Sequence, residues 1–218
     1  MDRRSLSLRW PAIVASLALT AVAVLGCKSG MESFALLYEG YDIPAEWDGL
    51  KGKTVAIVCK PLTSEEFSTS GAARALTEGI CDRLKANIKD IHLIDSQKVA
   101  ALVDEKGMDD YLEIGKELKA DKVVAIDIES FSVLDGQTLF RGRSTVSIRV
   151  YDVADKHVEW RKSPPRFEYP RIGSTPAADI GEMEFRNEFV AILAEHVARY
   201  FYPHDRHDDY GSDATSIR

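Results

Sequence analysis

The sequence predicts an α/β (α+β) domain, in which helices pack on a mixed sheet of about five strands that ends in an antiparallel meander. Three observations predict this class. β-Branched runs of strand length alternate with apolar stripes of helical period in the first half of the domain. Three strand-like segments with short connections follow, which is typical of antiparallel pairing. A final amphipathic segment completes the order: strand, helix, strand, two helices, three strands, helix.

The first half begins with a buried strand and a long helix. "KTVAIVC", residues 53–59, is a β-branched run that Pro61 ends. Ser68, Thr69 and Ser70 are candidate N-caps for the helix that follows. Apolar residues then recur every fourth position, as on one face of an amphipathic helix: Ala72, Leu76, Ile80, Leu84 and Ile88.

A short strand over residues 91–95 precedes two short helices. Ser96 is expected to cap the first of these helices, which runs to Val103. Asp109 or Asp110 is expected to start the second.

The meander begins with a long strand, residues 121–133, followed by "RGRSTVSIRVYD", residues 141–152. Both strands carry their most apolar residues at even positions. Because facing residues of an antiparallel pair share one side of the sheet, a three- or five-residue loop around Gly136 sets Ile126 opposite Val146.

The same test sets Val150 opposite Val158 in the second hairpin of the meander. The two registers also bring opposite charges together on the other face of the sheet, Glu129 near Arg143 and Arg149 near Glu159.

The last part of the domain is a surface crossing followed by a helix. "KSPPRFEYPRIGSTP" has four prolines and is expected to cross the surface over about 15 residues without regular structure. The helix is expected from Asp179 to Tyr202, with a broad apolar face on the sheet. Residues 51–202 form the single domain, and residues 203–218 are expected to be a disordered tail.

The first 26 residues are typical of a secretory signal. Three arginines precede an apolar run from Trp10 to Gly26, which is too short and too weak for a membrane-spanning helix. The run ends in "VLGC", residues 24–27, which resembles the lipobox of bacterial lipoproteins. This resemblance implies cleavage before Cys27 and a diacylglycerol thioether on its sulfur. A plain signal peptide or an uncleaved anchor is the alternative.

The residues after the lipobox set the expected location and tether. Lys28 stands where an aspartate would favour retention at the inner membrane, so the resemblance implies the outer membrane, facing the periplasm. Residues 27–50 form a tether and an irregular lead-in whose aromatic side chains are expected to dock on the core.

Charge and cysteine content limit the function classes. The 218-residue chain has a net charge of −7, and removal of residues 1–26, which carry +2, makes it −9 over 192 residues. A chain this acidic is a poor candidate for general nucleic-acid binding. Cys59 and Cys81 could form a disulfide in an oxidising periplasm, but each stands at an apolar position, which favours buried free thiols.

Four segments carry a resemblance to the periplasmic α/β domain shared by the TolB N-terminal domain, CsgG and LpoB. They are "KTVAIVCKPL", "IHLIDSQKVAALV", "ELKADKVVAIDIES" and "VSIRVYDVADKHVEW". The resemblance implies a non-enzymatic envelope lipoprotein that works by contact with other envelope components. Asp127 stands where the family usually has glycine. The membrane hairpins with which CsgG builds its pore have no counterpart, so pore formation is not implied.

Two charged segments are candidate sites. Residues 139–172 carry a net charge of +4, and within them Arg161, Lys162, Arg166 and Arg171 are a candidate contact patch for an anionic lipid, a glycan or an acidic partner. A solvated sheet face with cross-strand ion pairs is the alternative. The "HDRHDD" tail, from His204 to Asp209, has metal-ligand residue types but no preformed scaffold, so we expect no metal site.

These observations favour a binding or assembly module tethered by acylated Cys27, without cofactor and without catalytic residues. Its expected partners are the membrane, through the lipid, and an envelope protein or the cell wall. A self-associating structural envelope protein is the second hypothesis. A hydrolase is the third, although no G-x-S-x-G elbow and no phosphate-binding glycine loop stands in the sequence.

Overall fold

The computed structural model describes residues 42–62, 67–106 and 110–205. The predicted signal segment, Cys27 and most of the predicted tail lie outside these residues. The described residues from Ile43 to Asp205 belong to one compact unit. Within the described part, no helix combines the length and the apolar character needed to cross a membrane.

The main sheet is mixed, as the sequence predicts. Its strands lie in the order β3-β2-β4-β5-β6, with bounds His92–Leu93, Thr54–Pro61, Lys122–Leu134, Leu139–Asp152 and His157–Lys162. β2 pairs in parallel with β3 and β4. β4, β5 and β6 pair antiparallel, so the predicted meander is confirmed.

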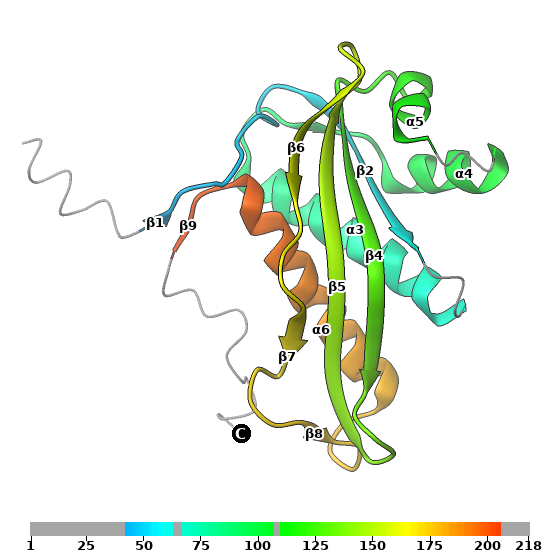
Figure 1. The fold of residues 1–218 in the computed structure, drawn as a ribbon, viewed down its shortest axis with the longest axis vertical. Coiled ribbons are helices and arrows are strands. Elements are labelled where there is room, and N and C mark those ends of the chain that lie inside the picture. Colours follow the sequence, from blue (N-terminus) through cyan, green and yellow to red (C-terminus); the bar gives the residue numbers. More distant parts are fainter. Residues whose placement is uncertain (1–41, 63–66, 107–109, 206–218) are drawn as a thin grey trace, which may run out of the picture. The chain divides into compact units, whose positions relative to one another are not determined.

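Helices cover the two faces of this sheet unequally (Figure 1). α3 (Phe67–Asn87) and α6 (Glu182–Ala198) lie side by side against one face. A short 3-10 helix, η1 (Arg199–Phe201), extends α6. α4 (Ser96–Lys106) and α5 (Tyr111–Glu117) cover only part of the other face, which we call the outer face.

The larger core lies between the sheet and α3 and α6. Even-numbered residues of β5, and of β4 as far as Ile128, point into it, and burying a side chain of this size contributes about 1.5–3 kcal/mol. The strands supply Val124, Ile126, Ile128, Val146, Ile148 and Val150. The helices supply Leu76, Ile80 and Leu84 from α3 and Phe185, Phe189, Leu193 and Val197 from α6. The apolar stripes predicted from the sequence are therefore the surfaces that form this core.

A smaller core lies on the outer face, beneath α4 and α5. Ala56 and Val58 of β2 and Val123 and Ala125 of β4 pack there against Val99, Tyr111 and Ile114. Because both faces of β2 and of the first half of β4 are covered, these strands read as continuous apolar runs.

Helix starts differ from the sequence predictions at two of three places. Asp110 caps α5 as predicted, accepting a hydrogen bond from the Leu112 amide at 2.8 Å. α4 begins at Ser96, and the Asp95 carboxylate, one residue earlier, accepts from the Gln97 amide at 2.8 Å. α3 begins at Phe67, so the three predicted capping residues lie within its first turn.

The β4–β5 hairpin keeps the predicted parity but not the predicted register. Ile126 faces Ile148, not Val146. The turn is centred one residue beyond Gly136, which moves the register by two and leaves even residues opposite even residues from Lys122 to Ile128. Glu129, predicted beside Arg143, is the extra residue of a β-bulge between Ile128 and Ser130.

The β5–β6 hairpin is likewise displaced by a bulge. Val150 faces Trp160 and Tyr151 faces Val158, so Glu159 is the extra residue. Glu159 therefore does not pair with Arg149 as predicted. It forms an ion pair with Lys122, whose ammonium also lies 2.6 Å from the Asp152 carboxylate.

The sequence predicts a proline-rich crossing without regular structure, and this prediction is wrong. It contains β7 (Phe167–Tyr169) and β8 (Thr175–Pro176), and both strands pair with β5. Phe167 and Tyr169 are buried against α6. Their apolar rings offset the breaks that the prolines impose, so the segment extends the sheet.

The irregular segment before β2 and the residues after α6 both make contacts that the structure describes. Trp47 stacks on Trp160, and its amide donates to the Tyr200 carbonyl at 3.1 Å, so this part of the predicted docking is confirmed. His204 and Asp205, which the sequence assigns to the tail, form the short strand β9, which pairs with β1 (Asp42–Ile43) in a separate sheet. The tail's other acidic and histidine residues lie outside the described part of the chain.

Gly142 of β5 shows how closely α6 approaches the sheet. A Cβ atom at this position would overlap the Phe189 ring. We predict that Gly142→Ala lowers the free energy of unfolding by about 1–3 kcal/mol, because the ring must move within a packed core. Urea denaturation measures the change. Gly71→Ala is the matched control, since a Cβ at this position of α3 meets no atom within 4 Å and alanine does not lower helix stability. Equal stability of the two variants would contradict this packing.

Candidate functional site

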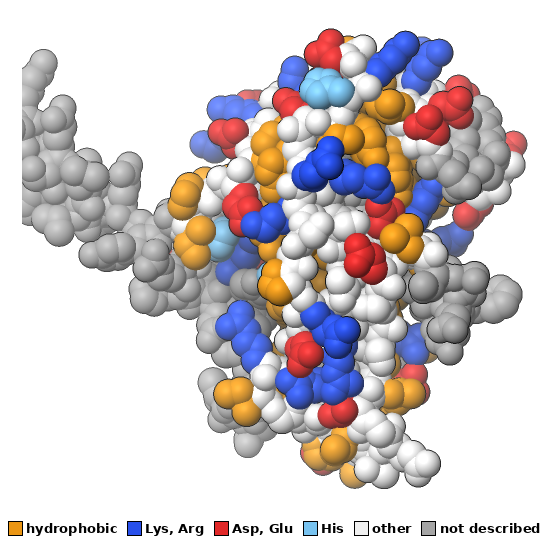
Figure 2. All heavy atoms as spheres, viewed as in Figure 1, with side chains coloured by type: hydrophobic (Ala, Val, Ile, Leu, Met, Phe, Trp, Pro, Cys, Tyr) orange, Lys and Arg blue, Asp and Glu red, His pale blue; other side chains and the backbone are white. Residues whose placement is uncertain are grey.

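The outer face of the sheet carries most of the charge of β5. Odd-numbered residues of this strand point away from α3 and α6, because side chains alternate along a strand. Figure 2 shows this face, with basic side chains over β5 and β6 and acidic side chains among them. The site described here is the part of this face that α4 and α5 leave open.

Asp127 of β4 is the centre of the outer face. Its side chain is buried, with the residue 1% exposed. One carboxylate oxygen accepts a hydrogen bond from the Tyr111 hydroxyl of α5. The other accepts from the Arg149 guanidinium of β5. Both oxygens are thus partnered, as a buried carboxylate requires, and the residue holds α5 and β5 together.

Two tyrosines and two cations surround this carboxylate. The rings of Tyr111 and Tyr151 lie 5.5 Å apart. The Arg149 guanidinium lies 5.5 Å from the Tyr111 ring centre and 5.8 Å from that of Tyr151. The Lys60 ammonium lies 5.1 Å from the Tyr111 ring centre. The rings therefore provide a face on which cations are held at the surface.

The environment fixes the protonation of these groups. Burial, followed by the hydrogen bond to Asp127, raises the pKa of Tyr111. Burial also raises the pKa of Tyr151. For Arg149, burial is the largest single effect and acts to lower the pKa, but the hydrogen bond to Asp127 and the negative charge of this carboxylate together outweigh it, so the pKa rises. At neutral pH the tyrosines are neutral donors and the guanidinium is charged.

Two other arginines of β5 are paired with carboxylates. Arg141 forms an ion pair with Glu168 of β7 at 2.7 Å. Arg143 forms one with Asp135 at 2.7 Å, and Asp135 also accepts from the Ser174 hydroxyl at 2.5 Å. These contacts tie the β4–β5 turn to the crossing that follows β6.

Arg161 of β6, unlike these arginines of β5, has no carboxylate partner among the described residues. It lies directly opposite Arg149 in the β5–β6 ladder and is exposed. No carboxylate of the described residues forms an ion pair with it, and Arg149 is already bound to Asp127. Like charges directly opposite each other destabilise a sheet. Because Asp127 offsets the charge of Arg149, Arg161 is the cation at this position that no described carboxylate compensates.

The other three members of the predicted patch do not gather around Arg161. Lys162 lies opposite Ile148, on the side of the sheet that faces α6, and its ammonium binds Glu46 at 2.6 Å. Arg166 and Arg171 are exposed in the crossing. The pKa of His196 of α6 is lowered to about 4. Burial is the main cause, and the nearby charge of Arg171 lowers the pKa further.

The two described cysteines are free, as the sequence favours. Burial raises the pKa of the Cys59 and Cys81 thiols to about 12. They are protonated at neutral pH and behave as apolar side chains.

Sequence reasoning placed Arg149 and Arg161 in a basic segment but missed their apposition. It also noted Asp127 only as a departure from a family pattern. A signal was present, because an aspartate in the middle of an apolar strand needs donors, and a tyrosine and an arginine stand on the neighbouring elements. The contact of Arg149 with Asp127 was not predicted, because the predicted β5–β6 register paired Arg149 with Glu159.

Comparison with known proteins gives likenesses in structure. No family model and no curated protein matches the sequence. A PelC dodecamer from Paraburkholderia phytofirmans is 13% identical, with 72% of this chain and 90% of that chain covered and a TM-score of 0.40. Lipoprotein GNA1162 from Neisseria meningitidis is 8% identical, with coverages of 66% and 97% and a TM-score of 0.41. The LpoB C-terminal domain from Salmonella enterica is 12% identical, with coverages of 56% and 87% and a TM-score of 0.36. Likenesses at this level assign no function to this chain.

Removal of the Tyr111 hydroxyl tests the role of the buried carboxylate. We predict that Tyr111→Phe lowers the free energy of unfolding by about 1.5–3 kcal/mol, the range for a hydrogen bond to a charged group. Thermal or urea unfolding measures it. Tyr151→Phe is the matched control and should change stability by less than about 0.5 kcal/mol. If both variants were equally stable, Asp127 would not depend on this donor.

Proposed function

We propose that the protein is a non-enzymatic binding module of the bacterial envelope. Its domain is tethered by a lipid on Cys27 and faces the periplasm from the outer membrane. It works by contact, and the outer face of its sheet meets an anionic component of the envelope. Support for the tether comes from the lipobox-like end of the apolar run, and support for the contact comes from the charge on β5 and β6.

The apposition of Arg149 and Arg161 is the observation that carries the contact. Arg149 is oriented by Asp127, so one guanidinium is held in place before any partner arrives. Arg161 is exposed beside it on the neighbouring strand. An anion between the two strands would relieve their mutual repulsion and accept charge-assisted hydrogen bonds from both.

The surrounding charge makes this contact selective. The chain as a whole is acidic, with a net charge of −7, so it repels anionic surfaces in most orientations. Because the outer face carries positive charge on an otherwise acidic protein, electrostatic attraction orients this face toward an anionic partner. The tether complements it, because a protein held at the membrane by two or more acyl chains remains bound there while its domain searches for a partner.

Loss of the lipid acceptor tests the tether. We predict that Cys27→Ala leaves the domain folded and moves it from the membrane pellet to the soluble fraction, because no thioether can form. Fractionation of cell envelopes followed by immunoblotting measures the distribution, and circular dichroism checks the fold. A variant whose signal is cleaved and which still pellets with the membrane would show that the lipid is not what retains the protein.

Charge reversal on the outer face tests the contact. We predict that Arg161→Glu weakens binding of the purified, unlipidated protein to washed envelope fragments by about tenfold, because it removes a cation and adds a repelling charge. Co-sedimentation over a range of salt concentrations measures it. Lys85→Glu on α3 makes the same charge change at an exposed position and should bind like the unaltered protein. Equal binding of both variants would remove the outer face from the proposal.

A further inference from the structure

The outer edge of β2 is only partly covered by β3. The pairing of the two strands is limited to Thr54 with His92 and Val55 with Leu93. The Ile94 amide then donates to the Val55 carbonyl at 2.9 Å, and the chain turns into α4. Among the strands that the structure describes, none pairs with this edge from Ile57 to Pro61.

The alternation of main-chain groups shows which residues of β2 face the open edge. The carbonyls of Lys53 and Val55 accept hydrogen bonds from the β3 segment. The carbonyl of Thr54 accepts from the Asp121 amide on the β4 side. Odd-numbered residues of β2 therefore direct their main-chain groups away from β4, and those of Ile57 and Cys59 face the open edge. Pro61 agrees with this parity, since proline in a sheet stands where an N–H would face outward.

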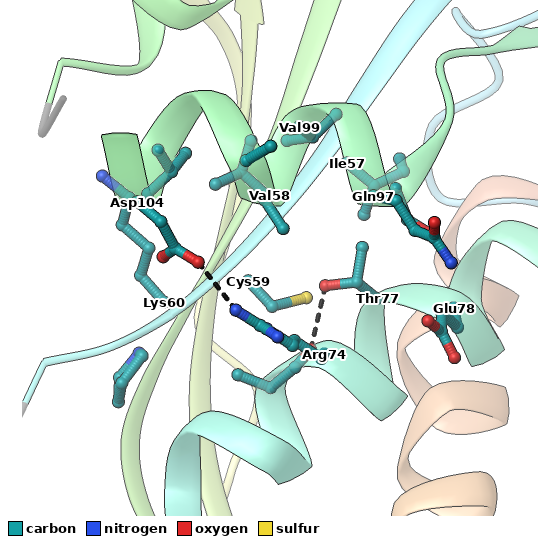
Figure 3. A pocket seen from close by; sticks show the side chains of 16 residues that line it. Ile57, Val58, Cys59, Lys60, Arg74, Thr77, Glu78, Gln97, Val99 and Asp104 are labelled. Atoms are coloured by element: carbon teal, nitrogen blue, oxygen red, sulfur yellow. Dashed lines mark hydrogen bonds and ion pairs between the residues drawn. The ribbon is translucent and has the colours of Figure 1, made fainter. Parts of the chain in front are cut away.

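A groove lies along this open edge, between α3 and α4 (Figure 3). Its volume is about 530 Å³, within the range of ligand sites. Ala73 and Thr77 of α3 form part of one wall, and Val99, Ala100 and Val103 of α4 form part of the other. Small side chains on both helices leave the space between them open.

We propose that this groove receives an extended polypeptide segment of a partner protein, which adds to β2 as a strand in line with β3. The open N–H and C=O groups of Ile57 and Cys59 are the donors and acceptors that an added strand uses. The edge from Ile57 to Pro61, with which no described strand pairs, accommodates about five residues, or roughly 16 Å. The proposal rests on the sheet edge and is independent of the arginine pair on the outer face.

The side chains that α3 and α4 contribute to the groove determine which kind of polypeptide segment fits. α3 and α4 lie on opposite faces of the sheet, so an added strand is covered on both sides and its side chains alternate between the two helices. Small and β-branched apolar side chains fit the alanine and valine walls. An ion pair between Arg74 and Asp104 joins the two helices at 2.7 Å (Figure 3). Both side chains are more than half exposed, so the pair can open at little cost when the segment enters.

The test uses the intact unlipidated protein and a capped pentapeptide of alternating threonine and valine as the probe. Amide hydrogen exchange, followed by NMR, reads each residue of β2. Without peptide, the Ile57 and Cys59 amides exchange faster than those of Val58 and Lys60, which face β4. With saturating peptide, exchange at Ile57 and Cys59 slows at least tenfold, and exchange at Val58 and Lys60 does not change.

Two controls separate strand addition from other occupants. The same peptide N-methylated at all its amides should bind about thirtyfold more weakly, the loss that two main-chain hydrogen bonds would cause. Ala100→Trp fills the groove and should abolish protection, whereas Ala86→Trp, at an exposed position of α3 outside the groove, should not.

Several results would overturn the proposal. These are absence of binding, equal binding of the N-methylated peptide, and binding without protection of Ile57 and Cys59. The last result would show that the groove takes an apolar ligand and not a strand.

Discussion

The two-residue period of β5 is the constraint on which the structure depends. This strand pairs with β4, β6, β7 and β8, so it sets the position of most of the sheet. Its even residues form the core with α3 and α6, and its odd residues carry the arginines of the outer face. A slip by one residue would bury the guanidinium groups and expose the valines and isoleucines, so the core fixes the location of the charge.

The same separation of faces explains the groove beside β2. α3 packs on one face of this strand and α4 on the other, so the sheet itself holds the two helices apart. β3 ends after two residues, while both helices continue beyond it. The space between them is bounded on its inner side by main-chain groups of β2 with which no described strand pairs. Burial of this edge by a partner segment would complete a layer that the described strands leave unfinished.

Much of this architecture could be predicted from residue patterns, and the parts that could not have physical causes. Hydrophobic period identified the strands and the helices, and parity placed Ile126 and Ile148 on one face. It could not locate the bulges at Glu129 and Glu159, because an extra residue leaves the apolar pattern of short stretches intact. The strand that contains Phe167 and Tyr169 was not predicted because prolines stand on both sides of it, although the spacing of the two aromatic residues by two fits an edge strand.

The candidate site was predicted in composition but not in arrangement. A run of basic residues identified the segment, yet strand alternation sends Arg161 and Lys162 to opposite sides of the sheet. The proposed contact pair, Arg149 and Arg161, spans two strands and depends on the bulge that shifts their register. Asp127, Tyr111 and Arg149 lie on three elements, and a pattern read along the chain does not bring them together.

We propose that this domain acts by contact while a lipid on Cys27 holds it in the envelope. The most direct measurement is the intact mass of the native protein extracted from cell envelopes with detergent. With a lipid anchor, we expect a chain that begins at Cys27 and carries the added mass of a diacylglycerol thioether, with or without a further acyl chain on the new amine. A full-length chain, or a cleaved chain without acyl mass, would contradict the tether and with it the proposed mode of action.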